Sequence, residues 1–191
     1  YTFDNPTGGS VSFASSDTNA NTTASNFSSG SGFNLNSTAV TNAFTSEGLG
    51  LSDGVGSGLA DAISANDYYN FSINAVAGST FNLTDISLDV GRSQNGAQDF
   101  YLFSSVDGFT ETDVLASQTG VAVSAGNVAV VPLNFNFESP VFGGLSTVEF
   151  RVYVDNRFNN SISSSGTFVD NVVVNADIVS AIPEPTALGL L

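Results

Sequence analysis

This chain of 191 residues contains no cysteine, histidine, lysine, methionine or tryptophan. Without cysteine there is no disulfide framework and no thiolate nucleophile, and without histidine there is no Ser-His-Asp triad and no imidazole ligand for zinc or haem. The absence of lysine removes Schiff-base chemistry. Paired carboxylates remain, but Glu149 and Asp155, the nearest pair on one strand face, are too far apart for a glycosidase site. We therefore expect a non-enzymatic protein.

Positive charge and long apolar runs are also scarce. There are 18 acidic residues against 3 basic ones, and the formal net charge is −15. A phosphate backbone or an anionic membrane surface would repel such a chain, which excludes nucleic-acid binding. No run of about 20 apolar residues occurs, so we expect no transmembrane segment in this chain.

What the chain does have is enough apolar side chain to form a core, since hydrophobic residues make up 41% and include 16 Phe. Apolar residues alternate with polar ones in residues 69–73, 81–90, 133–137 and 148–154, which is typical of half-buried strands. Turn residues separate these runs. The pattern predicts an all-β fold, a single antiparallel jelly-roll-like β-sandwich of about ten strands.

Two local features interrupt this pattern. The alternation changes phase between Leu83 and Ile86, which predicts a β-bulge near Thr84 and Asp85. The Gly-rich segment 47–66 is the longest expected loop and holds one possible helical turn at 59–63. We expect residues 1–180 to form the sandwich domain and residues 181–191 to form an extended C-terminal tail.

The tail carries a motif. Pro183, Glu184 and Pro185 are followed by small and apolar residues up to Leu191. This segment resembles the start of a PEP-CTERM sorting signal, although the full membrane span and terminal Arg cluster of that signal are missing here. Residues 65–180 also resemble a β-sandwich domain that recurs in such proteins. The resemblance implies export with an exosortase as partner, and an extracellular or outer-surface location in a bacterium with an outer membrane and an exopolysaccharide matrix.

A calcium site is implied by a second resemblance. Residues 3–6 and 168–172 are similar to the first and last strands of carbohydrate-binding jelly rolls, which are neighbours and share a structural Ca²⁺. The resemblance implies that Asp4 and Asp170 are calcium ligands. The alternative is that Asp170 and Asn171 cap or hydrogen-bond the backbone near a strand end.

Three tyrosines are candidates for sugar binding. Tyr68, Tyr101 and Tyr153 lie on the strand phase opposite to the neighbouring core residues. Exposed aromatic rings stack on the apolar faces of sugars, so the three could form a binding platform. Tyrosine is also common on exposed sheet faces without any ligand.

Two functions follow from these observations. The first is a structural protein of a bacterial surface or matrix that self-assembles into a filament or layer through strand edges and terminal segments, so that its partner is a second copy. The residues expected to join copies are Tyr1, Phe3, Leu188, Leu190 and Leu191, and self-repulsion at −15 predicts that salt or Ca²⁺ promotes assembly. The alternative is a Ca-dependent polysaccharide-binding module held in the exopolysaccharide matrix.

Overall fold

The computed structural model describes residues 2–3, 19–32, 44–47, 58–93, 95–123, 129–157 and 166–180, with only the backbone described at 2–3, 44–47 and 157. The first sheet contains β1 (Thr2–Phe3), β4 (Phe44–Glu47), β6 (Ser79–Arg92), β9 (Ala129–Asn136) and β11 (Gly166–Ser180). The second contains β2 (Thr22–Ala24), β3 (Ser28–Ser29), β5 (Tyr68–Ala75), β7 (Ala97–Ser104), β8 (Ala116–Gln118) and β10 (Thr147–Arg157). Two short helices accompany them, α1 (Leu59–Ala65) and the 3-10 helix η1 (Pro140–Phe142).

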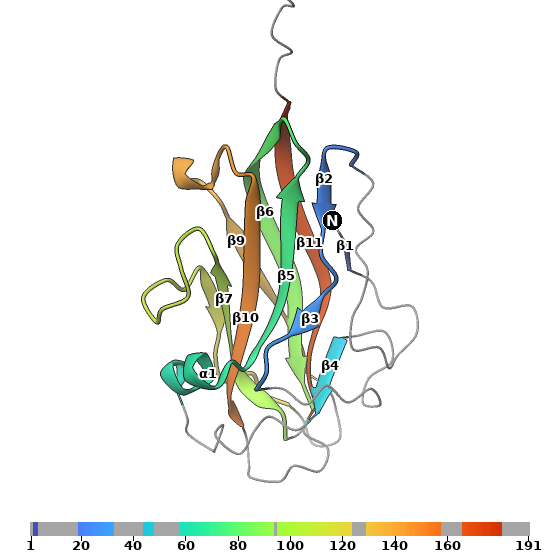
Figure 1. Cartoon of the computed structure of the whole chain (residues 1–191). Coiled ribbons are helices and arrows are strands. Elements are labelled where there is room, and N and C mark those ends of the chain that lie inside the picture. The colour runs from blue at the N-terminus through green and yellow to red at the C-terminus, as the bar shows by residue number, and fades with distance from the viewer. Residues whose placement is uncertain are drawn as a thin grey trace, which may run out of the picture.

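The sheets form two layers, and Figure 1 shows their long strands running side by side along the molecule. The first has the order β1-β11-β6-β9, with β4 also paired to β11. The second has the order β2-β5-β10-β7-β8, with β3 also paired to β5. All of these pairs are antiparallel. The predicted all-β antiparallel sandwich is confirmed.

The core lies between the layers and follows the alternation in the sequence. Along β5, every second side chain from Tyr69 to Ile73 is at most 2% exposed, while the residues between them reach the other face. The long strands β6, β9, β10 and β11 add their own inward rows to the same cluster. Large rings fill much of it, including Phe71, Phe81 and Phe150. Period-2 burial of apolar side chains is therefore what holds the two sheets together.

The predicted bulge is confirmed at Thr84. Asn175 of β11 pairs with Asp85 of β6, while the next residue, Ala176, pairs with Leu83, so Thr84 is the extra residue. Its side chain is exposed, and the residues on either side of the shift, Leu83 and Ile86, both remain buried. The extra residue thus lets the two halves of β6 present their apolar side chains to one core.

Helix α1 confirms the helical turn expected in the segment before β5. It begins after Gly58 and ends at Asn66, whose φ of 63° places it in the left-handed region that often terminates helices. The helix packs against β10 at one end of the sandwich (Figure 1). Among the residues that the structure describes, no helix is long and apolar enough to cross a membrane.

Candidate functional site

The three predicted tyrosines form one row on the outer face of the second sheet. Tyr153 of β10 pairs with Tyr68 of β5 on one side and with Tyr101 of β7 on the other. The rings of Tyr68 and Tyr153 meet edge to face, with centroids 5.1 Å apart at 66°. The strand-phase prediction is therefore right in bringing the three residues together on the face opposite to the main core.

This outer face is covered by other parts of the chain, and the sugar platform must be corrected for that reason. Ala62 of α1 packs with Phe103 and Tyr153 in a second, smaller apolar cluster, to which Phe109 also contributes. Tyr153 is only 1% exposed. A ring that is already covered by a helix and a loop cannot stack on a sugar, so Tyr153 is a core residue.

Arg151 occupies the ring face that a sugar would need on Tyr68. Its guanidinium carbon lies 4.4 Å from the centroid of the Tyr68 ring and 3.8 Å from that of Phe109. Its Nε donates to Glu149 at 2.7 Å, and its Nη1 donates to the Tyr153 hydroxyl at 3.1 Å. Burial lowers the pKa of Arg151, but these hydrogen bonds outweigh burial and leave the pKa above its ordinary value. The cluster thus fastens the loop that carries Phe109 to the sheet.

The calcium prediction is only partly within the described structure. Asp4 lies outside the described residues, while the Oδ1 of Asp170 accepts a hydrogen bond from the Asn171 N–H at 2.8 Å. The first and last strands are neighbours as expected, since Phe3 pairs with Val172. No cluster of three or more acidic side chains placed to hold a metal occurs within the described ranges. Calcium binding by Asp4 and Asp170 stays a prediction.

The free side of β11 is the place where the structure bears on assembly. One side of β11 pairs with β6 along nearly its whole length. On the other side, β4 covers residues 166–169 and β1 covers residues 172–173. The N-terminal segment that was expected to add to a neighbouring molecule thus pairs with its own chain at Phe3, which corrects that prediction. Tyr1 and the tail residues Leu188, Leu190 and Leu191 lie outside the described residues.

Residues 175–180 form what we call the open edge of β11, because no described strand pairs with them there. Phe81 exchanges two main-chain hydrogen bonds of 2.9 Å with Leu145, on the side of β6 that faces away from β11. Its cross-strand partner Ile178 is therefore in a non-hydrogen-bonded pair, and the N–H and C=O of Ile178 point away from β6. The N–H and C=O of Ala176, two residues earlier on the same strand, point in the same direction.

The open edge carries apolar side chains on both faces, with the polar Asn175 and Asp177 on the outer one. Ala176 and Ile178 turn inward and pack against the core, but each is only partly buried because the sheet ends beside them. Val179 turns outward and is 47% exposed, one of the most exposed large apolar side chains in the described chain. Asp177 is the one charged residue of this stretch. An added strand would find both hydrogen-bonding groups and apolar surface here.

Some solved structures are similar to this chain. No protein-family model and no curated protein matches the chain. A Stig cyclase from Fischerella sp. TAU, crystallised with an indole compound, is similar at 16% identity and a TM-score of 0.38, over 88% of this chain and 81% of the cyclase. A cleaved adhesin domain of Lys-gingipain from Porphyromonas gingivalis is similar at 16% identity and a TM-score of 0.33, over 85% of this chain and 88% of the adhesin. Another adhesin domain of Lys-gingipain matches at 12% identity and a TM-score of 0.36, over 90% and 97%.

The comparison corrects one prediction. The chain was expected not to be an enzyme, yet three cyclase structures are among the solved structures that it resembles. The expectation is contradicted and is dropped. At 16% identity and a TM-score of 0.38 the likeness assigns no reaction to this chain.

Proposed function

We propose that this chain is a structural protein of a bacterial surface or matrix, and that copies polymerise when the C-terminal segment of one copy adds to the open edge of β11 in the next. The observation that carries the proposal is the open edge itself. Its main-chain groups at Ala176 and Ile178 point away from β6, and its inward side chains are incompletely covered. Such an edge pairs readily with an extended segment of another chain.

The C-terminal segment suits this edge in spacing and in charge. Residues 186–191 read Thr-Ala-Leu-Gly-Leu-Leu and contain no charged side chain. In an extended strand, Leu188 and Leu190 point to the same face, with the same separation as Ala176 and Ile178. Because each copy carries a net charge of −15, an uncharged segment approaches the edge with less repulsion than an acidic one.

The contact would propagate. One copy contributes its tail and receives another tail at β11, so the two surfaces are different and the interface does not close on itself by symmetry. Heterologous interfaces of this kind produce rings or open filaments. We therefore expect linear polymers or layers in preference to a closed dimer.

A matched pair of substitutions in the first sheet tests the acceptor. Val179→Lys puts a charge on the open edge of β11, while Val130→Lys makes the same change at the similarly exposed Val130 of β9, at the other side of the sheet. Both variants reduce the net negative charge equally. Only Val179→Lys should block polymers, by raising the concentration at which they form by at least about tenfold, as about 1.4 kcal/mol per contact would. Negative-stain microscopy and light scattering provide the measurement.

The donor is tested by a second pair in the tail. Leu188→Asp places a carboxylate on the face proposed to cover Ile178, whereas Ala187→Asp places one on the opposite face. Polymers should be lost with Leu188→Asp and retained with Ala187→Asp. Dispersed monomers in the unaltered protein, or an equal effect of the two members of either pair, would overturn assembly through the tail and the open edge.

The proposed location is the extracellular face of a bacterium with an outer membrane. Its support is the resemblance of the tail around Glu184 to a sorting signal, with an exosortase as the partner during export. Replacing Pro183 and Pro185 by alanine should leave the protein in the cell fraction instead of the medium or matrix. Quantitative blotting of the two fractions decides this, and unchanged distribution would remove the sorting role.

A further inference from the structure

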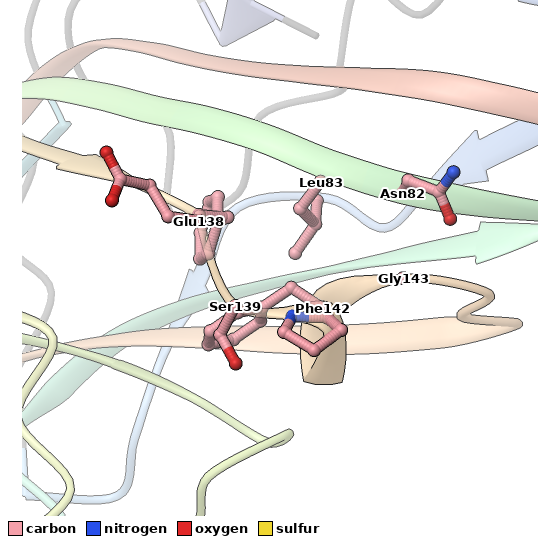
Figure 2. Close-up of a pocket in the computed structure, with 8 residues that line it drawn as sticks. Asn82, Leu83, Glu138, Ser139, Phe142 and Gly143 are labelled. Carbon is pink, nitrogen blue, oxygen red and sulfur yellow. The ribbon is translucent and has the colours of Figure 1, made fainter.

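A pocket lies beside β6, at the place where β9 has already ended. The chain leaves β9, turns through η1 and packs against the first half of β6, as Figure 2 shows. The pocket between them has a volume of about 380 Å³, within the range of small-molecule sites. It is lined by Asn82, Leu83, Phe137, Glu138, Ser139, Pro140, Phe142 and Gly143.

The apolar part of this pocket is rigidly built. Leu83, Phe137 and Phe142 are at most 8% exposed, so they present a small apolar surface at the base. The rings of Phe137 and Phe142 pack with centroids 4.6 Å apart. The loop that follows η1 is also held to β6, because the Oδ1 of Asn82 accepts a hydrogen bond from the Gly144 N–H at 2.7 Å. A ligand would therefore meet a preformed wall.

Polar groups surround the apolar part. Once the Asn82 oxygen is engaged by Gly144, the NH₂ of the same amide remains as a donor. The exposed carboxylate of Glu138 supplies acceptors. The Ser139 hydroxyl accepts from the Val141 N–H at 3.5 Å at the start of η1 and keeps its own proton as a donor. In Figure 2, Asn82 and Glu138 lie on opposite sides of Leu83. A ligand placed over Leu83 would therefore have a polar side chain on either side of it.

The charge of the pocket narrows the ligand class. Its lining contains one carboxylate and no arginine, and the chain as a whole carries −15, so an anionic ligand would be repelled. A compound with hydroxyl groups on its rim and apolar C–H faces matches the alternation of donors, acceptors and phenylalanine surface. We propose that this pocket binds a sugar residue of a neutral polysaccharide.

The proposed sugar site lies next to the open edge of β11 but is lined by other residues. Its Asn82 pairs with Asp177 of the open edge, so the two proposed sites are neighbours across the β6–β11 strand pair. It also differs from the tyrosine row, which is on the second sheet. Binding should be unchanged in the Leu188→Asp variant, which alters the tail and leaves every residue of the pocket lining in place, so that failure of assembly and failure of sugar binding can be told apart.

The experiment is a titration of the full chain with neutral gluco-, manno- and galacto-oligosaccharides, followed by amide chemical shifts and calorimetry. A uronic-acid oligosaccharide tests the anionic class and an amino-sugar oligosaccharide tests the cationic one. At least one neutral oligosaccharide should shift the amide signals of Asn82, Leu83 and Gly143. Glu138→Gln, which keeps the shape of the side chain, should weaken that binding by at least about tenfold, as loss of a hydrogen bond to a charged group would.

Glu111→Gln is the matched control, because Glu111 is an exposed glutamate in the loop after β7 and its substitution removes the same charge. It should leave the affinity unchanged. Ser139→Ala should weaken binding by a smaller factor. Absence of shifts with every neutral oligosaccharide, tighter binding of the uronic-acid or amino-sugar oligosaccharide, or equal losses in Glu138→Gln and Glu111→Gln would each overturn the sugar site.

Discussion

The hydroxyl of Tyr69 on β5 donates a hydrogen bond of 2.7 Å to the main-chain carbonyl of Thr167 on β11. The two strands belong to different sheets, so this bond crosses the core and ties the two layers together. Both residues are fully buried. A donor and an acceptor that are both removed from water depend on each other, since neither can find a replacement partner there.

Substitution of Tyr69 by phenylalanine tests this link. The ring and its packing remain, but the carbonyl of Thr167 loses a buried partner, so the free energy of unfolding should fall by about 1 to 3 kcal/mol. Urea denaturation measures the change. Tyr101→Phe is the control, because the hydroxyl of Tyr101 makes none of the hydrogen bonds recorded for the described residues. Equal losses in the two variants would contradict a special role for the Tyr69 hydroxyl.

The packing of Arg151 against Phe109 predicts a measurable coupling. Because the guanidinium lies 3.8 Å from the ring centroid, a double-mutant cycle with Arg151→Met and Phe109→Leu should give an interaction of about 0.5 to 2 kcal/mol. Amide hydrogen exchange in residues 105–114 should accelerate in both single variants, since either one releases the loop. Additive effects of the two substitutions would show that the ring and the cation do not interact.

Tyr101 predicts how stability depends on alkaline pH. Burial raises the pKa of Tyr101 to about 12, with a further contribution from the negative charges of Asp99 and Asp155. In the unfolded chain the pKa returns to about 10, so the unfolded state loses its proton first. Stability from this group is complete below about pH 10 and declines as pH rises toward the folded pKa. The fall in the free energy of unfolding over this window should be smaller in Tyr101→Phe than in the unaltered protein.

Salt should promote the proposed polymers. Copies that each carry −15 repel one another over about 30 Å at 0.01 M ionic strength but over only about 8 Å at 0.15 M. Light scattering should therefore increase with sodium chloride. Calcium chloride at the same ionic strength distinguishes screening from specific binding, and Asp170→Asn tests the predicted ligand. If assembly is unaffected by ionic strength and by a chelator, the electrostatic account is wrong.

Sequence alone predicts the parts of this fold that depend on local alternation. The inward row of β5 and the phase shift at Thr84 follow directly from which neighbouring residues are apolar. A second irregularity on β11 was not predicted, although Asn171 is a residue that tolerates the left-handed region. Its φ is 49°, and its amide donates to the Asp89 carboxylate at 2.8 Å. The pattern did not indicate this irregularity because the residues that follow it, Val172 to Val174, are all apolar. Such a run does not show which of its side chains face the core.

The sites were harder to predict because they depend on packing between distant segments. Tyr153 was correctly placed on the outer face, but α1 and the loop of Phe109 cover that face. Strand periodicity does not indicate whether another segment packs on a sheet face. The open edge has the same alternating pattern as a central strand, since only strand order makes Ile178 an edge residue. The pocket is lined by Asn82 and Phe142, which are 60 positions apart, so no local motif indicates it.

The placement of Arg92 and Arg151 within sheets has a consequence for resistance to proteases. Arg92 is 2% exposed in β6, where its Nε donates to the Val121 carbonyl at 2.6 Å. Arg151 lies within a paired central strand under an aromatic ring, and Arg157 is the last residue of that strand. Proteases that cut after basic residues need several residues in extended, accessible form. With no lysine and with Arg92 and Arg151 held inside sheets, the folded protein presents such proteases with few places to begin.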